Sequence, residues 1–261
     1  MTLVETEDLG RIHAAGWPLP QEMWLGWSAY DKSFAVHELT GLRSFDYYKK
    51  RIAALGFTGK DAVLDLGCGI GQWSCALACA NGHVLALDPN KDRLSAASRL
   101  SAALGIGNCS YAGAAAERLP CADGAIDAVF CYGVFMFTDM PRSLTEMHRV
   151  LKPGGVVYIN ANSWGWYAHL LMDRGLRQGD WKMARTALDM ARRAFSGATS
   201  QMLVRRGWLS RQIRDAGFEA EAWGREGEIA LSAIEKRPPA AYPRNFYGLP
   251  AILEVILRKP A

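Results

Sequence analysis

The sequence predicts an α/β fold, a doubly wound and mostly parallel sheet accompanied by N-terminal helices and a helical insertion. Short apolar runs alternate with stretches of helical spacing from about residue 61 to residue 161, which is typical of parallel strands joined by right-handed crossovers. Half of the 261 residues are apolar and 21% are charged, which suits a buried core. Residues 162–200 then carry two helical stretches where a compact domain needs only a short connection.

The expected strands are bounded by turns and glycines, and the expected helices by caps. Leu94, Ala97, Leu100 and Leu104 recur at helical spacing. Pro141 suits a first helical position, and Pro153-Gly154-Gly155 is expected to separate its helix from the next strand. Helices are expected at about 72–80, 90–104, 141–151 and 203–216, and seven strands at 62–66, 83–87, 108–112, 125–131, 156–160, 218–223 and 252–257.

The expected helices and strands divide the chain into four regions. Residues 1–58 form an N-terminal segment, with helices at about 21–55, that is expected to cover the site. Residues 59–161 form the core, and residues 162–200 a helical lid insertion. Residues 201–261 return to the sheet, with a loop insertion near 229–249 that contains Pro238-Pro239.

Composition excludes several classes of protein. No apolar run reaches the roughly 20 residues that span a bilayer, and the acidic start, with Glu5, Glu7 and Asp8, does not resemble a signal peptide. We therefore expect a cytoplasmic protein. None of the six cysteines forms a CxxC pair, so no metal site is expected. The net charge of +4 is too small to indicate nucleic acid.

The most informative stretch is Val63 to Gly71, an apolar strand followed by glycines at alternate positions. Such glycines permit a tight turn and close approach of a ligand to the backbone. Asp88 ends the next strand, 21 residues beyond Gly67, where a carboxylate can accept hydrogen bonds from ribose hydroxyls. The dinucleotide pattern GxGxxG fails, because the sixth position from Gly67 is Gln72. These features favour a nucleoside-bearing ligand other than NAD.

Residues 61–151 resemble the class I methyltransferases that depend on S-adenosylmethionine (SAM), especially those that modify small molecules. Val63 to Gly71 is similar to the first motif of that family, and Leu87-Asp88-Pro89 to its ribose-binding position. Glu117 to Pro120 with Asp123-Gly124, and Leu151 to Gly155, resemble two further turns. The last strand, before Arg258-Lys259-Pro260, resembles the antiparallel edge strand of the family. The resemblance implies a Rossmann-like sheet of seven strands.

The resemblance also implies which residues contact SAM and its product S-adenosylhomocysteine. Gly67 and Gly69 would face the methionine tail and ribose, Asp88 the ribose hydroxyls, and Pro89 the adenine. Ala116 and Glu117 would approach the adenine edge through their backbone. Ala115 departs from the family, in which an Asp often stands two residues before the Glu. The full set of expected cofactor contacts is Asp65, Gly67, Cys68, Gly69, Asp88, Pro89, Ala116, Glu117, Cys131, Tyr132 and Tyr30.

Methyl transfer from a sulfonium depends mainly on alignment, and a general base is needed only where the acceptor must lose a proton early. His37 and His169 are the candidate bases, each alternatively a packing residue of the lid. Aromatic residues after the fifth strand could line an apolar acceptor pocket or form the core of the lid itself. The segment from Asp173 to Asp215 contains ten Lys or Arg residues and four Asp residues. These basic residues either form a solvated face or bind an anionic acceptor. The candidate acceptor contacts are Trp164, Trp166, Tyr167 and Arg244.

The predicted function is therefore transfer of a methyl group to oxygen or nitrogen of a small molecule, a secondary metabolite or a sugar-type acceptor. One alternative is a catalytically silent binding or scaffold protein with the same fold. An RNA or protein methyltransferase is a weaker alternative, because Cys131-Tyr132-Gly133-Val134 stands where an Asn- or Asp-Pro-Pro-aromatic motif would be. No nucleic-acid partner and no membrane span are expected. The segment from Tyr242 to Tyr247 either closes over the acceptor or mediates a homodimer.

Overall fold

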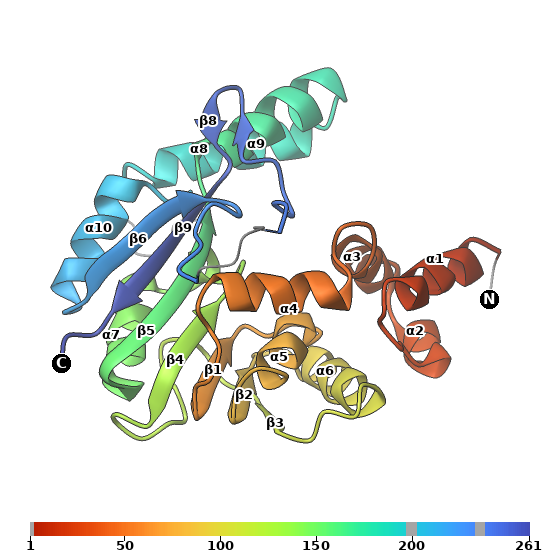
Figure 1. The fold of residues 1–261 in the computed structure, drawn as a ribbon. Helices are drawn as coiled ribbons and strands as arrows, with labels where there is room; N and C mark the ends of the chain where they lie inside the picture. Colours follow the sequence, from red (N-terminus) through yellow and green to blue (C-terminus); the bar gives the residue numbers. More distant parts are fainter. Residues whose placement is uncertain (1–2, 197–202, 233–237) are drawn as a thin grey trace. The chain divides into compact units, whose positions relative to one another are not determined.

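The computed structural model describes residues 3–196, 203–232 and 238–261 (Figure 1). The chain divides into two units, of which the first comprises Met1–Ala115 with Ala230–Pro239 and the second comprises Ala116–Ile229 with Ala240–Ala261. Residues 197–200 of the expected lid insertion and residues 233–237 of the expected loop insertion lie outside the described residues. Within the described ranges, none of the helices combines the length and apolar character that crossing a membrane requires.

Seven strands form one sheet in the order β3-β2-β1-β4-β5-β9-β6. The pairs β1–β2, β2–β3 and β4–β5 are parallel, whereas β9 is antiparallel to both β5 and β6. The predicted α/β fold with an antiparallel last strand is confirmed. The expectation that this strand lies at the edge is wrong, because β9 pairs on both sides and β6 forms the edge. The bounds are β1 Ala62–Leu66, β2 His83–Leu87, β3 Cys109–Ala112, β4 Ile126–Cys131, β5 Leu151–Asn162, β6 Glu219–Arg225 and β9 Ile252–Arg258.

In the first unit, two helices follow the first two strands. Helix α5 (Gln72–Ala78) begins at Gly71, whose left-handed backbone (φ 86°) turns the chain out of the glycine-rich loop. Helix α6 (Lys91–Ala103) begins at Asn90, whose side chain accepts hydrogen bonds from the backbone N–H groups of Asp92 and Arg93. Every residue of α5 is buried, so this helix fixes the loop that precedes it against the sheet.

The N-terminal segment contains a helix ahead of the expected range of about 21–55, since residues 3–14 form α1 (Leu3–Ala14) before the three other helices. Leu9 and Ile12 of α1 are buried, and the ring of His13 hydrogen-bonds the carbonyl of Leu19 at 2.8 Å. Trp17, which is fully buried, packs against the rings of Phe45 and Tyr48. The remaining helices are α2 (Gln21–Gly26), α3 (Ala29–Leu39) and α4 (Phe45–Ala54).

In the second unit, helix α7 (Met140–Val150) runs directly into strand β5. Asp139 caps α7, with Pro141 in its first turn as expected. The strand begins at Leu151, earlier than the predicted residue 156, and Pro153-Gly154-Gly155 lies inside it as an irregularity in the pairing with β4. Gly155 is required there, because a Cβ would come within 2.8 Å of the carbonyl oxygen of Lys152.

The insertion after β5 contains three helices that share a small core. They are α8 (Trp164–His169), a π-helical segment η2 (Leu170–Arg177) and α9 (Trp181–Arg193). Tyr167, Ala187, Ala194 and Leu203 are buried together, with Trp164 and Trp166 packed against them. The chain continues through α10 (Arg206–Asp215) to β6 and then to a hairpin of β7 (Asn245–Phe246) and β8 (Leu249–Pro250), where a loop was expected.

Candidate functional site

The glycine-rich loop after β1 has the left-handed backbone that its sequence predicts. Gly67, Gly69 and Gly71 have φ values of 77°, 55° and 86°, which favour glycine. The N–H groups of Gly67 and Cys68 donate to the carbonyl of Leu87 at 2.7 and 2.9 Å. These bonds tie the loop to the carboxyl end of β2, the edge at which open α/β sheets bind ligands.

Asp88 lies against this loop. Its carboxylate accepts hydrogen bonds from the N–H of Gly69 at 3.1 Å and from that of Asn90 at 2.8 Å. The side chain is 5% exposed, whereas the neighbouring Pro89 is exposed. An ionised carboxylate has about four lone-pair sites, so Asp88 retains capacity to accept from two vicinal hydroxyl groups.

Asp65, in β1, supplies a second buried carboxyl group near the loop. It is 2% exposed, and its Oδ2 accepts from the hydroxyl of Ser74 at 2.5 Å. Burial raises the pKa of Asp65 to about 7, while the hydrogen bond from Ser74 opposes the rise and the Asp88 carboxylate adds to it. The carboxyl group of Asp65, near the loop, is therefore expected to change its protonation state near neutral pH.

Two observations show that the loop suits a polar, nucleoside-bearing cofactor. A Cβ on Gly69 would have no heavy atom within 4 Å, so this side of the backbone is open to a ligand. Gln72, the first residue of α5, is 6% exposed, and its Oε1 has no hydrogen-bond partner among the described residues. A buried acceptor without a donor is costly, and a ligand N–H or O–H group would satisfy it. The residues present thus fit the expected cofactor.

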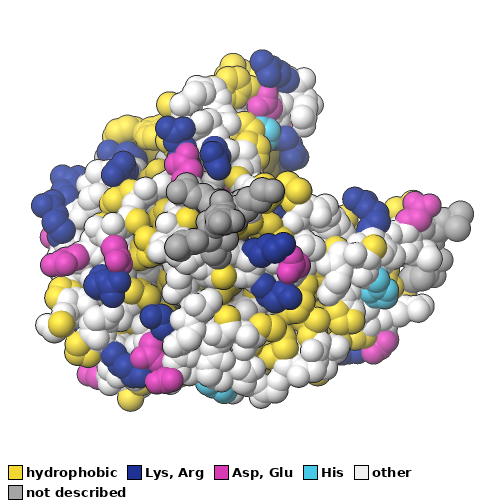
Figure 2. All heavy atoms as spheres, in the orientation of Figure 1, with side chains coloured by type: hydrophobic (Ala, Val, Ile, Leu, Met, Phe, Trp, Pro, Cys, Tyr) yellow, Lys and Arg dark blue, Asp and Glu magenta, His cyan; other side chains and the backbone are white. Residues whose placement is uncertain are grey.

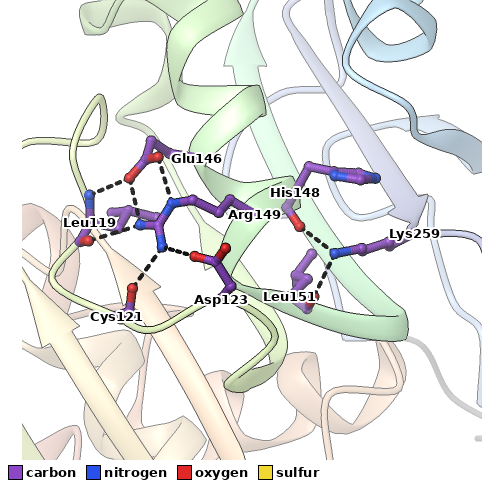
Figure 3. Close-up of polar contacts among 8 residues, drawn as sticks. All are labelled: Leu119, Cys121, Asp123, Glu146, His148, Arg149, Leu151 and Lys259. Carbon is purple, nitrogen blue, oxygen red and sulfur yellow. Dashed lines mark hydrogen bonds and ion pairs between the residues drawn. The ribbon is translucent and has the colours of Figure 1, made fainter.

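In the second unit, the segment from Ala116 to Asp123 is held by side chains of α7. Glu117 accepts from the N–H of Asp139 at 2.7 Å, so one of its carboxylate oxygens is already engaged. Arg149 donates to the carbonyls of Leu119 and Cys121 and to the carboxylates of Asp123 and Glu146, as Figure 3 shows. Lys259, after β9, donates to the carbonyls of His148 and Leu151. We refer to the Arg149 contacts as the arginine brace.

The turn after β4 is held by a polar network that sequence reasoning missed. The hydroxyl of Tyr132 donates to Glu226 at 3.1 Å, and the amide of Asn160 donates to the same carboxylate at 3.3 Å. Asn160 also accepts from the N–H of Gly133 at 2.6 Å. Glu226 and Asn160 are 1% and 2% exposed. Asn160 ends the predicted strand 156–160, whereas Glu226 lies three residues beyond the predicted strand 218–223, so no local pattern linked the two.

A second buried carboxylate, Glu254 of β9, adjoins this network. It is 0% exposed and accepts from the hydroxyl of Tyr158 at 2.8 Å and from the N–H groups of Gly227 and Ile229 at 3.1 and 3.4 Å. Cys131, an expected cofactor contact, is fully buried at the end of β4. The network therefore fixes the backbone at Tyr132 and Gly133, directly after Cys131.

The two candidate bases lie in different surroundings. His37 is in α3 with an exposed side chain, and partial burial and the Arg43 guanidinium lower its pKa, with Glu38 opposing them. His169, at the end of α8, pairs with Asp173 at 2.7 Å and stacks on the ring of Phe246 at 4.3 Å. Their catalytic roles stay predictions. Tyr30 belongs to α3, but its side chain lies outside the described residues.

Three of the four candidate acceptor contacts, Trp164, Trp166 and Tyr167, meet in the small core of the insertion. Tyr167 is 4% exposed in the core of the insertion. Trp166 packs edge-on against Tyr242, and the side chain of Arg244 is exposed. Trp164 lines a cavity together with Arg205, Arg206 and Trp223. Trp164 is thus the aromatic candidate with access to a cavity, and the role of all four in acceptor binding stays a prediction. Among the described residues, no group of His, Cys, Asp and Glu could hold a metal ion.

Comparison with known proteins finds similarity over part of the chain. A family model described as a methyltransferase domain matches residues 64–159. The ubiquinone/menaquinone biosynthesis C-methyltransferase UbiE of Francisella philomiragia is 34% identical over 128 residues, which cover 47% of this chain and 48% of that protein. The corresponding enzyme of Haemophilus ducreyi is also 34% identical over 128 residues, with 47% of each chain covered. The chain thus spans about half the length of the curated relatives it matches.

Solved structures share the fold at low sequence identity. A geranyl diphosphate methyltransferase in complex with SAM is 16% identical, with a TM-score of 0.60 and coverage of 90% of this chain and 92% of that one. A chain from the complex with the Haloferax volcanii Trm112 methyltransferase activator has a TM-score of 0.61 at 19% identity, covering 90% and 95%. The [4+2]-cyclase SpnF has a TM-score of 0.58 at 18% identity, covering 84% and 82%. At these identities the likeness shows the fold alone.

Proposed function

We propose that this chain is a class I SAM-dependent methyltransferase, which binds SAM and transfers its methyl group to a small molecule. The match of residues 64–159 to a family model described as a methyltransferase domain supports the proposal. The observation that carries the proposal is the pairing of Asp88 with the open glycine-rich loop. The carboxylate lies 3.1 Å from the N–H of Gly69, where a Cβ on Gly69 would have no heavy atom of the described residues within 4 Å. This is the arrangement that a ribose and an amino-acid tail require.

The residues of the chain divide between holding and aligning the cofactor. Asp88 would hold the ribose hydroxyls, Gly67 and Gly69 would admit the methionine portion, and the exposed ring of Pro89 would pack on adenine. SAM supplies an electrophilic methyl group on a sulfonium with a neutral leaving group. The chain must then orient the acceptor and exclude water, since positioning can supply several kcal/mol of the barrier. The buried Tyr132–Glu226–Asn160 network supports this role by fixing the turn after β4.

Oxygen, nitrogen and carbon acceptors place different demands on the chain. A hydroxyl acceptor needs a group that takes its proton. His37 meets one condition for this role, because its lowered pKa favours the neutral imidazole, the form that can accept a proton. We propose oxygen or nitrogen as the methylated atom. The curated relatives are named C-methyltransferases, so acceptors with an activated ring carbon belong in the same assay, and mass spectrometry of the product identifies the atom.

The experiment that tests cofactor binding is calorimetry with Asp88→Ala. Loss of hydrogen bonds to a charged group should weaken SAM binding by about 1–3 kcal/mol. Asp92→Ala is a matched control, because Asp92 is an exposed carboxylate four residues later, and its affinity for SAM should equal that of the wild type. Equal affinities for Asp88→Ala and the wild type would refute the proposed ribose contact.

A catalytically silent or differently reacting protein is the second candidate. The fold similarity to the cyclase SpnF favours considering it, because one fold hosts several chemistries. Incubation with SAM labelled in the methyl group separates the two candidates. Transfer of label to a small molecule supports the methyltransferase, whereas calorimetric binding of SAM without transfer to any acceptor in a broad panel supports the silent protein.

A further inference from the structure

A cavity of about 510 Å³ lies in the second unit, at the start of α10. Its walls come from the beginning of α8, the beginning of α10, the carboxyl end of β6 and the beginning of β9. Figure 2 shows Lys and Arg side chains gathered over the part of this face that α10 occupies in Figure 1. The side chains that matter for its chemistry are Trp164, Arg205, Arg206, Trp223, Arg225 and Glu228.

We propose that this cavity binds a phosphate monoester whose organic part is an aromatic ring. The proposal does not depend on methyl transfer, because every wall belongs to the second unit and none of the expected ribose contacts is among them.

Among the described residues, no carboxylate pairs with the guanidinium groups of the arginines that line the cavity. Arg206 lies over the ring of Trp223, with 4.9 Å from Cζ to the ring centroid, and Arg205 lies over Phe195 at 4.6 Å. The Nε atom of Arg205 is buried and has no hydrogen-bond partner among the described residues. Within the described ranges, no ion pair involves Arg205, Arg206 or Arg225. Their donors are therefore available, and stacking holds two of the three guanidinium planes in place.

The charge of the cavity favours a dianion. Three guanidinium groups face one carboxylate, that of Glu228, whose Oε2 accepts from the N–H of Arg225 at 2.9 Å. The excess of positive charge matches a phosphate monoester, which carries close to two negative charges at pH 7 and three acceptor oxygens. Guanidinium forks pair with such oxygens in a bidentate manner. The first turn of α10 adds backbone donors, because no side chain caps it.

The rest of the cavity is apolar. Trp164 and Trp223 contribute indole rings, and Pro250 and Leu253 complete the surface. Flat aromatic groups pack well against such walls. The cavity volume also lies within the range of about 300–1,000 Å³ typical of small-molecule sites, so the ring and the phosphate can be accommodated together.

Calorimetric titration with phenyl phosphate, inorganic phosphate and phenol tests the proposal directly. Phenyl phosphate should bind most tightly, because it meets both the arginines and the indole rings. Arg206→Gln and Arg205→Gln should each reduce its affinity about tenfold or more, the scale of a lost hydrogen bond to a charged group. Glu228→Gln, which keeps the acceptor for the Arg225 N–H and removes the opposing charge, should increase affinity.

Arg211→Gln is the matched control, since Arg211 lies exposed on the same helix and outside the cavity lining. It should bind phenyl phosphate as the wild type does, and all four variants should bind SAM with unchanged affinity, which also reports that they are folded. The proposal is overturned if phenyl phosphate does not bind. It is equally overturned if Arg205→Gln and Arg206→Gln bind it as tightly as Arg211→Gln does.

Discussion

Gly69 and Gly71 look equivalent in the sequence, but the structure separates their roles. A Cβ on Gly71 would lie 2.8 Å from the Cβ of Ala97 and 3.0 Å from its Cα, so this glycine allows α6 to approach the loop. A Cβ on Gly69 would meet nothing within 4 Å. Both have a left-handed backbone. One glycine is therefore needed for packing, and the other leaves space beside Asp88.

This difference predicts different effects of the two substitutions on stability and on SAM affinity. Gly71→Ala combines backbone strain with a steric clash, each costing about 1–3 kcal/mol, and should clearly lower the free energy of unfolding in urea. Gly69→Ala should cost about 1–2 kcal/mol of stability through strain alone, yet reduce SAM affinity because its methyl group enters the proposed ligand space. If Gly69→Ala binds SAM as the wild type does, the ligand does not approach that side of the loop.

Asp65 predicts a pH dependence of stability. Its carboxyl group has an ordinary pKa of 3.8 and a folded-state pKa of about 7. Between these values the folded protein retains a proton that the unfolded chain has lost, so this group makes the free energy of unfolding fall as pH rises from about 4 to about 7. Above that window its contribution levels off.

The measurement compares urea unfolding of the wild type and Asp65→Asn at pH 5 and pH 8. The variant has no charge to bury, so it should gain stability relative to the wild type at pH 8 compared with pH 5. Asp61→Asn, at an exposed position just before β1, should show no such gain. A constant difference between Asp65→Asn and wild type at both pH values would mean that Asp65 does not titrate in this range.

At the scale of single residues, the sequence predicted where residues lie in the fold better than which residues they hydrogen-bond. Asp88 and the three glycines lie where the pattern placed them, because strand ends and turns are local features. Glu226 and Asn160 are 66 residues apart in the sequence and share one hydrogen bond. Nothing local indicates that the two will meet, since their contact depends on the order of the strands. The roles of the expected site residues stay predictions.

At the scale of elements, the arginine brace holds the irregular segment between β3 and β4 against α7. Removing it with Arg149→Met eliminates donors to two backbone carbonyls and two carboxylates. The free energy of unfolding should fall by about 1–2 kcal/mol, reduced from the buried case because the side chain is partly exposed. Calorimetry should also show weaker SAM binding, because the braced segment carries Ala116 and Glu117.

Arg142→Met is the control for that change. Arg142 lies on the same helix with a side chain that is 78% exposed and a distant ion pair of 3.7 Å. Its substitution should change stability by less than about 0.5 kcal/mol and leave SAM affinity as it is. Equal effects of the two substitutions would show that the brace contributes nothing beyond an ordinary surface arginine.

The elements that differed from expectation share a physical cause. Strand β5 begins at Leu151 because the pairing of Leu151 with Ile126 of β4 overrides the local tendency of Pro153-Gly154-Gly155 to break structure. Helix α1 forms because Leu9 and Ile12 find buried positions. Gly175 allows η2 to pack closely on α9, since a Cβ at this position would lie 2.7 Å from the Cβ of Ala184. Tertiary contacts decided each case, and a local pattern does not contain them.

At the scale of the whole molecule, the sheet was predictable because hydrophobic runs, turns and crossovers repeat along the chain. The order of its last strands was not. The expected edge position of the last strand rested on the resemblance to the methyltransferase family. The strand instead pairs with β5 through residues Val156 to Asn162 and with β6 through Glu219 to Arg225, and this arrangement buries Glu254 beside Tyr158.

The central position of β9 has a consequence for biosynthesis. Until β9 is in place, β5 and β6 have no partner between them, and the edges that later pair with β9 have open hydrogen-bonding groups. Such unpaired edges template aggregation, and closing them requires a contact of long sequence separation, which slows folding. The nascent chain is thus expected to depend on chaperone protection until residues 252–258 emerge and complete the sheet.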